Sequence, residues 1–132
     1  MQLLLSFLFL LKVAAMPPTP IDPQRVEAEL AADVDVLRSL NENGDIPSIV
    51  RRVDVRFVGS TDNVISLEKQ IGPLGWRVVQ RVPLEDGREA LDVQREQTTD
   101  VTAIRQLTEA ALEIEAQYDV HYDGWGTVAK QR

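Results

Sequence analysis

Two patterns of apolar residues alternate along most of this chain, and their order limits the fold more than any other feature of the sequence. Apolar side chains recur at every second position in four segments, as in strands, and at every third or fourth position in two segments, as in helices. The predicted strands and helices, in chain order, cover residues 52–57, 62–71, 76–82, 90–96, 100–118 and 120–122. The order is therefore β-α-β-β-α-β. Because strand–helix–strand units are right-handed, two interlocked units form a ferredoxin-like α+β sandwich, with a four-stranded antiparallel sheet and two helices on one face.

The inward faces of these segments supply the predicted core. In residues 52–57 apolar positions alternate with charged ones, so one face of this strand is buried and the other meets water. Residues 83–89 contain Asp86-Gly87 and predict the loop of a hairpin. The predicted core residues on strands are Val53, Val55, Phe57, Trp76, Val78, Val82, Leu91 and Val93. Those on helices are Val64, Leu67, Ile71, Ile104, Leu107, Ala111, Ile114 and Tyr118.

An additional N-terminal helix is predicted before this unit. Asp22-Pro23 supplies an N-cap residue and a proline at the first helical position, and Asn43-Gly44 ends the segment. The sequence leaves open whether this helix packs on the sheet edge, beside the other two helices or across the open face. Its predicted apolar stripe consists of Val26, Leu30, Val34, Leu37 and Leu40. Its predicted polar face consists of Glu27, Glu29, Asp33, Asp35 and Glu42.

The chain divides into an apolar and Pro-rich extension at residues 1–21, a predicted domain at residues 22–127 and a short tail at residues 128–132. The apolar run of residues 1–15 is shorter than the ~20 residues that a membrane-spanning helix needs. It is compatible with a mis-annotated start upstream of Met16, with an export or anchoring signal, or with an apolar appendage. We expect no membrane contact unless residues 1–15 are retained.

The residue types that most enzymes use for catalysis are scarce. The chain has no cysteine and one histidine, His121, so it lacks disulfides, thiolate sites and a His-rich metal site. Its glycines match no phosphate-binding pattern. Asp119 and Asp123 flank the last strand without a further metal-ligating neighbour in the sequence. The sequence therefore predicts a protein that is not an enzyme, with no catalytic residue, no cofactor and no metal.

The negative charge of the chain is concentrated in its predicted helices. The net charge is −7, and residues 22–45 alone carry seven acids and two bases. Residues 100–119 carry five acids and one base, and Glu109 and Glu113 lie one helical turn apart on the same face. Such acidic faces repel nucleic acid and suit a basic protein partner, although they also keep small proteins soluble.

The predicted open face of the sheet does not resemble an RNA-binding surface. RNA-recognition domains stack bases on aromatic side chains of this face, whereas the charges here are mixed in sign and no aromatic residue is present. Direct binding to nucleic acid is therefore disfavoured. The residues expected on this face are Arg52, Asp54, Arg56, Arg77, Val79, Arg81, Asp92, Gln94 and Glu96.

The last predicted strand runs directly into Tyr122-Asp123-Gly124-Trp125-Gly126. Two glycines around a tryptophan are costly in backbone entropy, and they allow turns that a residue with a Cβ cannot make. The flanking glycines therefore indicate that the indole of Trp125 has a defined position. It is either part of the core or an exposed anchor for a partner, since tryptophan is enriched among residues that dominate binding energies.

The stretch from Tyr118 to Thr127 resembles the end of a bacterial protein family, regulator of ribonuclease E activity B (RraB). The similarity begins near Gln24 and includes weaker likeness in residues 67–76 and 107–117. The resemblance implies a ferredoxin-like, cytoplasmic, non-enzymatic protein that binds a basic region of ribonuclease E and inhibits it, thereby modulating RNA decay. The partner-binding residues expected on this basis are Glu109, Glu113, Tyr122, Asp123, Gly124, Trp125 and Gly126.

A second hypothesis comes from a different class of function. Ferredoxin-like sheets also serve as small-ligand-binding or dimeric modules, and the sequence does not determine the oligomeric state. A partner other than ribonuclease E is compatible with this alternative.

Overall fold

A computed structural model describes residues 20–132, so the predictions made for the N-terminal residues 1–19 lie outside the described part of the chain. The described helices are α2 (Pro23–Glu42), α3 (Thr61–Gln70) and α4 (Val101–Tyr118). The described strands are β1 (Arg51–Gly59), β2 (Arg77–Pro83), β3 (Glu89–Gln97) and β4 (His121–Gly126). None of these helices is long and apolar enough to span a membrane.

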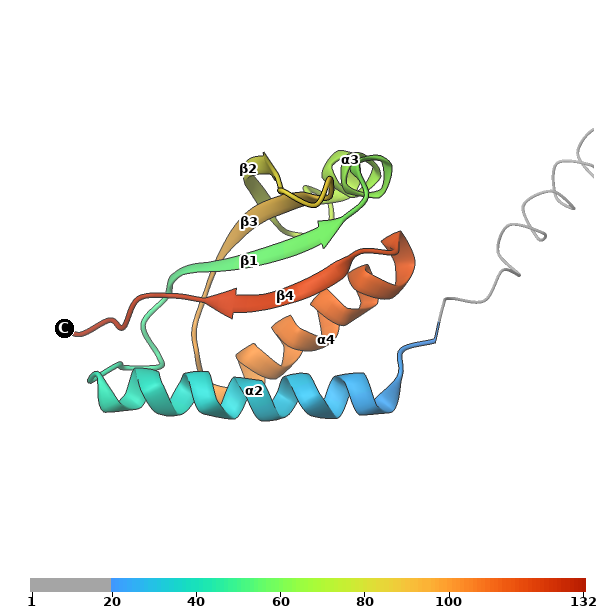
Figure 1. Ribbon diagram of the computed structural model, residues 1–132. Helices are drawn as coiled ribbons and strands as arrows, with labels where there is room; N and C mark the ends of the chain where they lie inside the picture. Colours follow the sequence, from blue (N-terminus) through green and yellow to red (C-terminus); the bar gives the residue numbers. More distant parts are fainter. Residues whose placement is uncertain (1–19) are drawn as a thin grey trace, which may run out of the picture.

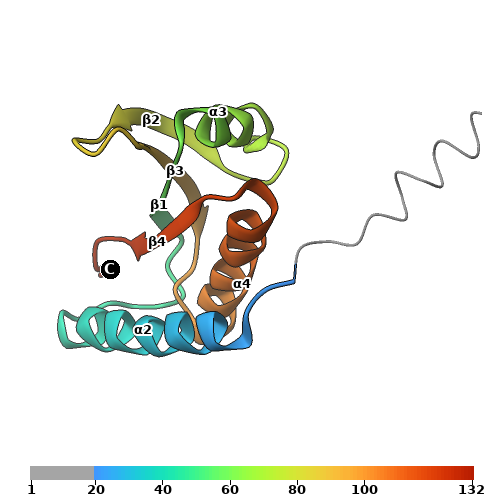
Figure 2. The ribbon, with the colours of Figure 1, turned by 45° about the vertical axis from the view of Figure 1, so that its right-hand side comes forward.

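The four strands form one antiparallel sheet in the order β2-β3-β1-β4. This order, with α3 and α4 packed on one face, confirms the ferredoxin-like prediction (Figures 1 and 2). Each helix begins where the sequence offers a cap: the side chains of Asp22, Ser60 and Asp100 accept backbone N–H bonds from the first helical turns. Local sequence therefore fixes where each of these helices begins.

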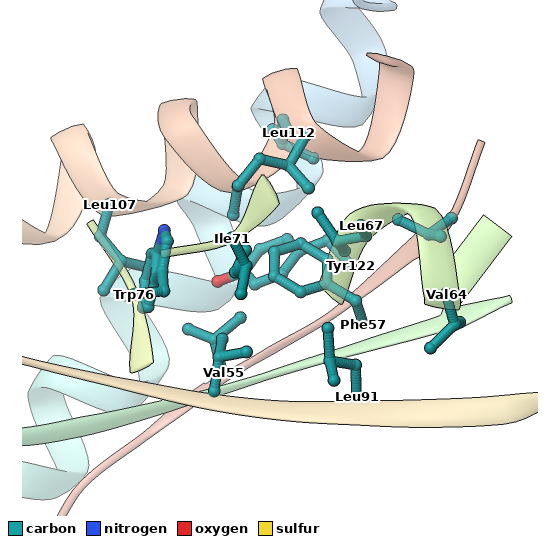
Figure 3. Packing of buried hydrophobic residues seen from close by; sticks show 14 of the residues in the cluster. Val55, Phe57, Val64, Leu67, Ile71, Trp76, Leu91, Leu107, Leu112 and Tyr122 are labelled. Carbon is teal, nitrogen blue, oxygen red and sulfur yellow. The ribbon is translucent and has the colours of Figure 1, made fainter. Parts of the chain in front are cut away.

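The core lies between the sheet and the two covering helices (Figure 3). Phe57 and Tyr122 lie on neighbouring strands, with ring centroids 6.0 Å apart. Leu112 of α4 and Leu67 of α3 lie near these rings, and Leu107 of α4 lies beside Trp76. Nearly all predicted core residues of β1, β3, α3 and α4 are buried, which confirms the inward faces deduced from periodicity.

The structure resolves the place of α2. It lies at the β4 end of the molecule, outside the sandwich, where it packs against α4 (Figures 1 and 2). The predicted faces of α2 were wrong at two positions. Asp33, predicted on the polar face, is buried with 5% exposure, and Val34, predicted on the apolar stripe, is 54% exposed. The physical reason is that Thr108 and Trp125 both donate hydrogen bonds to the Asp33 carboxylate, so this acid can enter the interface. The α2 side chains that face inward are therefore those at positions 26, 30, 33, 37 and 40.

A second correction concerns β2. Its pairing with β3 shifts register between Val78 and Gln80, as at a β-bulge. Beyond the shift, Arg81 lies opposite the buried Leu91 and pairs with Glu68 of α3, so Arg81 faces the helices and not the open face. Val82 is displaced to the opposite face from the one predicted. Val78, predicted to be core, is 37% exposed because β2 is an edge strand.

Candidate functional site

The closing segment, Tyr122–Gly126, lies within β4 at the edge of the sheet, so this strand is longer than the predicted residues 120–122. Gly124 has a φ of +86°, in the region that glycine adopts without strain. The register with β1 shifts between Val55 and Phe57, so β4 bends as it crosses β1. The bend places Trp125 opposite Val55, half-buried against the core.

Side chains of α2 and α4 occupy the outer edge of β4. The N–H of Tyr122 donates to Glu115 Oε1 at 2.8 Å, and Arg25 Nη2 donates to the C=O of Tyr122 at 2.8 Å. Arg25 and Glu115 also bind each other through two hydrogen bonds of 2.9 and 3.2 Å, and Arg25 contacts Glu29 on its own helix. This ion pair takes the place of a neighbouring strand, because it satisfies one donor and one acceptor of the exposed edge.

The pKa shifts of Glu115 and Arg25 agree with this geometry. Burial raises the pKa of Glu115, but the hydrogen bonds from Arg25 and from Tyr122 N–H outweigh burial and leave the pKa below its ordinary value. The Glu115 hydrogen bond raises the pKa of the Arg25 guanidinium. Both groups are therefore held in their charged forms where they meet the strand.

Asp33 joins α2 to the same strand and to α4. Its Oδ1 accepts a hydrogen bond from Trp125 Nε1 at 2.8 Å, and its Oδ2 accepts one from Thr108 Oγ1 at 2.6 Å. Neither donor is charged, and burial raises the pKa of Asp33 despite both hydrogen bonds. The indole N–H of Trp125 is thus fixed by an intramolecular partner.

A third polar cluster fixes the C-terminal tail beside the loop that follows α2. The buried Asp45 and Arg51 pair at 2.7 Å, and Asp45 also accepts from Thr99 Oγ1 at 2.9 Å and from Lys130 N–H at 2.8 Å. Burial raises the pKa of Asp45, but these hydrogen bonds outweigh burial and hold it below its ordinary value. The cluster joins the loop after α2 to β1, to the loop before α4 and to the C-terminal tail.

The residues predicted to bind a partner fall into two groups that the structure does not place side by side. Glu109 and Glu113 are exposed on α4, and Glu109 pairs with Arg105 at 3.1 Å. Tyr122 is buried, Asp123 is exposed, and the following Gly124, Trp125 and Gly126 are half-buried. The α4 side chains that reach α2 and β4 are instead Thr108, which precedes the two exposed acids in the chain, and Glu115, which follows them.

Sequence reasoning missed Arg25, Asp33, Thr108 and Glu115. For Asp33 a signal was present, because Val26, Asp33 and Leu40 are spaced by seven residues and lie on one side of a helix. An acid at the centre of an otherwise apolar stripe indicates a buried polar contact. Arg25 and Glu115 carry no such signal, since they lie 90 residues apart in the chain.

The open face of the sheet carries mutually satisfied charges. Arg56 and Asp92 form two hydrogen bonds of 2.7 and 3.0 Å across β1 and β3. Gln80 of β2 donates to Asp92, and Gln94 of β3 donates to Asp54 of β1. The open face is therefore a wet face, on which polar side chains pair across the strands. Among residues 20–132, no group of three or more His, Asp or Glu side chains is placed to hold a metal ion.

Comparison with known protein families adds an independent finding. Residues 30–127 match the family described as regulator of ribonuclease activity B. The match starts within α2 and ends just after β4, so it contains Asp33, Thr108, Glu115 and Trp125. A search of curated proteins finds no match.

Proposed function

The chain belongs to the regulator of ribonuclease activity B family, and from this premise we propose that it is a non-enzymatic inhibitor of ribonuclease E. The match over residues 30–127 is the observation that carries the proposal. Regulation would occur by protein–protein binding in the bacterial cytoplasm and would change which RNAs are cut and how fast. No bond to RNA is made or broken by the regulator itself.

The acidic helix surfaces support a basic partner region. Glu27, Asp35 and Glu42 are exposed on α2, and Glu109 and Glu113 are exposed on α4. These acids meet water on their free sides, so a basic segment can approach them without breaking a buried contact. Electrostatic complementarity of this kind steers association and makes binding sensitive to salt.

In this proposal the closing segment contributes to recognition by holding neighbouring elements in place. Trp125 donates its indole N–H to Asp33, and the backbone C=O of Tyr122 accepts from Arg25, so both residues hold β4 and α2 together. Asp123 is the residue of this segment whose side chain is freely exposed. In our proposal the segment keeps the two acidic helices in a fixed relation, and Asp123 adds one more acid at the sheet edge.

The direct test is an RNA cleavage assay with purified ribonuclease E and the full chain, at low and moderate salt. We expect inhibition that weakens as salt rises. The double charge reversal Glu109→Lys/Glu113→Lys should weaken inhibition by about tenfold without unfolding the domain, because both side chains are exposed.

A matched control distinguishes an effect of the α4 surface from an effect of the change in net charge. Glu85→Lys/Glu96→Lys makes the same change of charge at two exposed positions on the hairpin loop and on β3. We expect this variant to inhibit nearly as well as the parent protein. Equal weakening by both variants would contradict the α4 surface, and absence of inhibition by the parent protein would contradict ribonuclease E as the target.

A further inference from the structure

A small hollow opens between the C-terminal half of α2 and the start of α4. Its volume is about 270 Å³, below the roughly 300–1,000 Å³ of typical small-molecule sites. Two of its polar residues, Asp45 and Thr99, already bind each other, and Asp45 is neutralised by Arg51. The surface left for an incoming group is therefore mostly apolar. The lining residues are Leu37, Leu40, Asn41, Asp45, Pro47, Thr99, Asp100 and Val101.

Two exposed valines extend this apolar surface. Val101, in the first turn of α4, is 73% exposed, and Val34 on α2 is 54% exposed. Val34, Leu37 and Asn41 are spaced by three and four residues, so they follow one side of α2 toward the hollow. Neither valine is needed to fill the core, and apolar surface of this kind, gathered around a hollow, marks interaction sites.

The rim of the hollow favours positive charge. The last turn of α2 contains Glu42 and no basic residue, so no cationic side chain of the helix itself offsets the negative end of its dipole. The exposed bases nearest in sequence, Arg38 and Arg105, each pair with an acid of their own helix at 3.2 and 3.1 Å. Within residues 20–132, no ion pair engages Glu42.

We propose that this hollow receives one apolar side chain, flanked by lysine or arginine, from the basic partner segment that the acidic helices bind. The inference rests on the proposed function and specifies the chemistry of the partner at this surface. The apolar lining and the volume suit one large aliphatic side chain, while Glu42 and the end of α2 suit the flanking cations. Charge brings the segment to the surface, and the hollow selects the position at which it docks.

Two blocked peptides rich in lysine and arginine test this proposal, one with a central leucine and the other with serine at that position. Binding to the full chain is followed by NMR shifts of the backbone amides. We expect the leucine peptide to bind about tenfold or more tightly, with the largest shifts near Leu37 and Val101. Equal affinities for the two peptides would overturn the proposal, because charge alone would then explain binding.

A pair of variants tests whether the preference for leucine depends on the hollow itself. Val101→Lys adds a cation at the hollow, whereas Val128→Lys adds one at an equally exposed valine, 72% exposed, in the C-terminal tail. Val101→Lys should abolish the preference for leucine, and Val128→Lys should preserve it. The same loss in both variants would overturn the proposal.

The nuclease assay separates this inference from the proposed function. If the parent protein inhibits ribonuclease E but Val101→Lys inhibits as well as Val128→Lys, the nuclease does not use the hollow and the inference fails while the function stands. If the parent protein does not inhibit ribonuclease E, the proposed function fails, and the peptide comparison still decides whether the hollow binds a basic, leucine-containing segment.

Discussion

The two edges of this sheet are protected in different ways. At β4, the Arg25–Glu115 pair satisfies the N–H and C=O of Tyr122, and α2 lies alongside. At β2, no strand within residues 20–132 pairs with the outer edge, and Val79 is 50% exposed. The protection at β2 comes from the strand itself, through a bulge after Val78, arginines and a terminal Pro83. One edge therefore depends on tertiary contacts, and the other on its own sequence.

This comparison predicts where polar substitutions matter. The β4 side is joined to the rest of the molecule by three polar clusters, centred on Asp33, Asp45 and Glu115. The β2 side is joined by apolar packing and by ion pairs at the surface, such as that of Arg81 with Glu89. Removing one polar partner should therefore destabilise the β4 side more than the β2 side.

The largest effect is expected for Arg51→Met. The side chain of Arg51 is fully buried, and its loss leaves the Asp45 carboxylate buried without a cation. We expect a decrease of about 3–5 kcal/mol in the free energy of unfolding, measured with urea. Arg56→Met is the control, because its partner Asp92 lies on the wet face and the loss there should be about 1 kcal/mol or less. Similar losses in both variants would contradict the distinction between the buried Asp45 cluster on the β4 side and the ion pairs of the wet face.

A smaller and more local effect is expected for Glu115→Ala. The substitution removes the acceptor of the Tyr122 N–H and one partner of Arg25, so we expect a loss of about 1–3 kcal/mol. Hydrogen exchange of the Tyr122 amide should accelerate more than that of amides in β3. In the control Glu68→Ala, on the β2 side, the partner Arg81 is 3.7 Å away and the loss should stay below about 1 kcal/mol. Unchanged exchange at Tyr122 would show that the ion pair does not protect the edge.

The order of the elements was predictable from the sequence because periodicity and caps are local signals. Alternation in β1 and helical spacing in α4 identify buried faces without reference to the rest of the chain. The bulge in β2 was not predictable, since an added residue changes the facing of everything after it and leaves no mark in composition. Val34 misled the assignment of α2, because an exposed valine and a buried Asp33 reverse the usual rule.

The candidate site was predicted only in part. The closing segment stands out in the sequence because Gly124 and Gly126 flank Trp125. Its pairing with α2 does not, because contacts between residues about 90 positions apart depend on the packing of whole elements. The binding role of the exposed Glu109 and Glu113 stays a prediction for the cleavage assay.

A third effect, which distinguishes the two regions by the direction in which stability changes with pH, is expected for Asp33→Asn. Burial raises the pKa of Asp33 above the value of about 4 in the unfolded chain, so the native protein holds this proton more tightly. Its contribution to stability is full below about pH 4 and is lost as pH rises through the raised pKa. The asparagine removes this loss, and Thr108 can accept from its amide because a hydroxyl both donates and accepts.

Urea unfolding from about pH 4 to about pH 7 should therefore show wild type losing stability relative to Asp33→Asn, by no more than about 1.4 kcal/mol per pH unit. Asp92→Asn on the wet face should behave oppositely. There a hydrogen bond from Arg56 holds the pKa of Asp92 below its ordinary value, so the acid stabilises wild type above about pH 4. Parallel pH profiles for the two variants would mean that the Asp33 carboxylate is effectively solvated, and that α2 is not closed over β4 in solution.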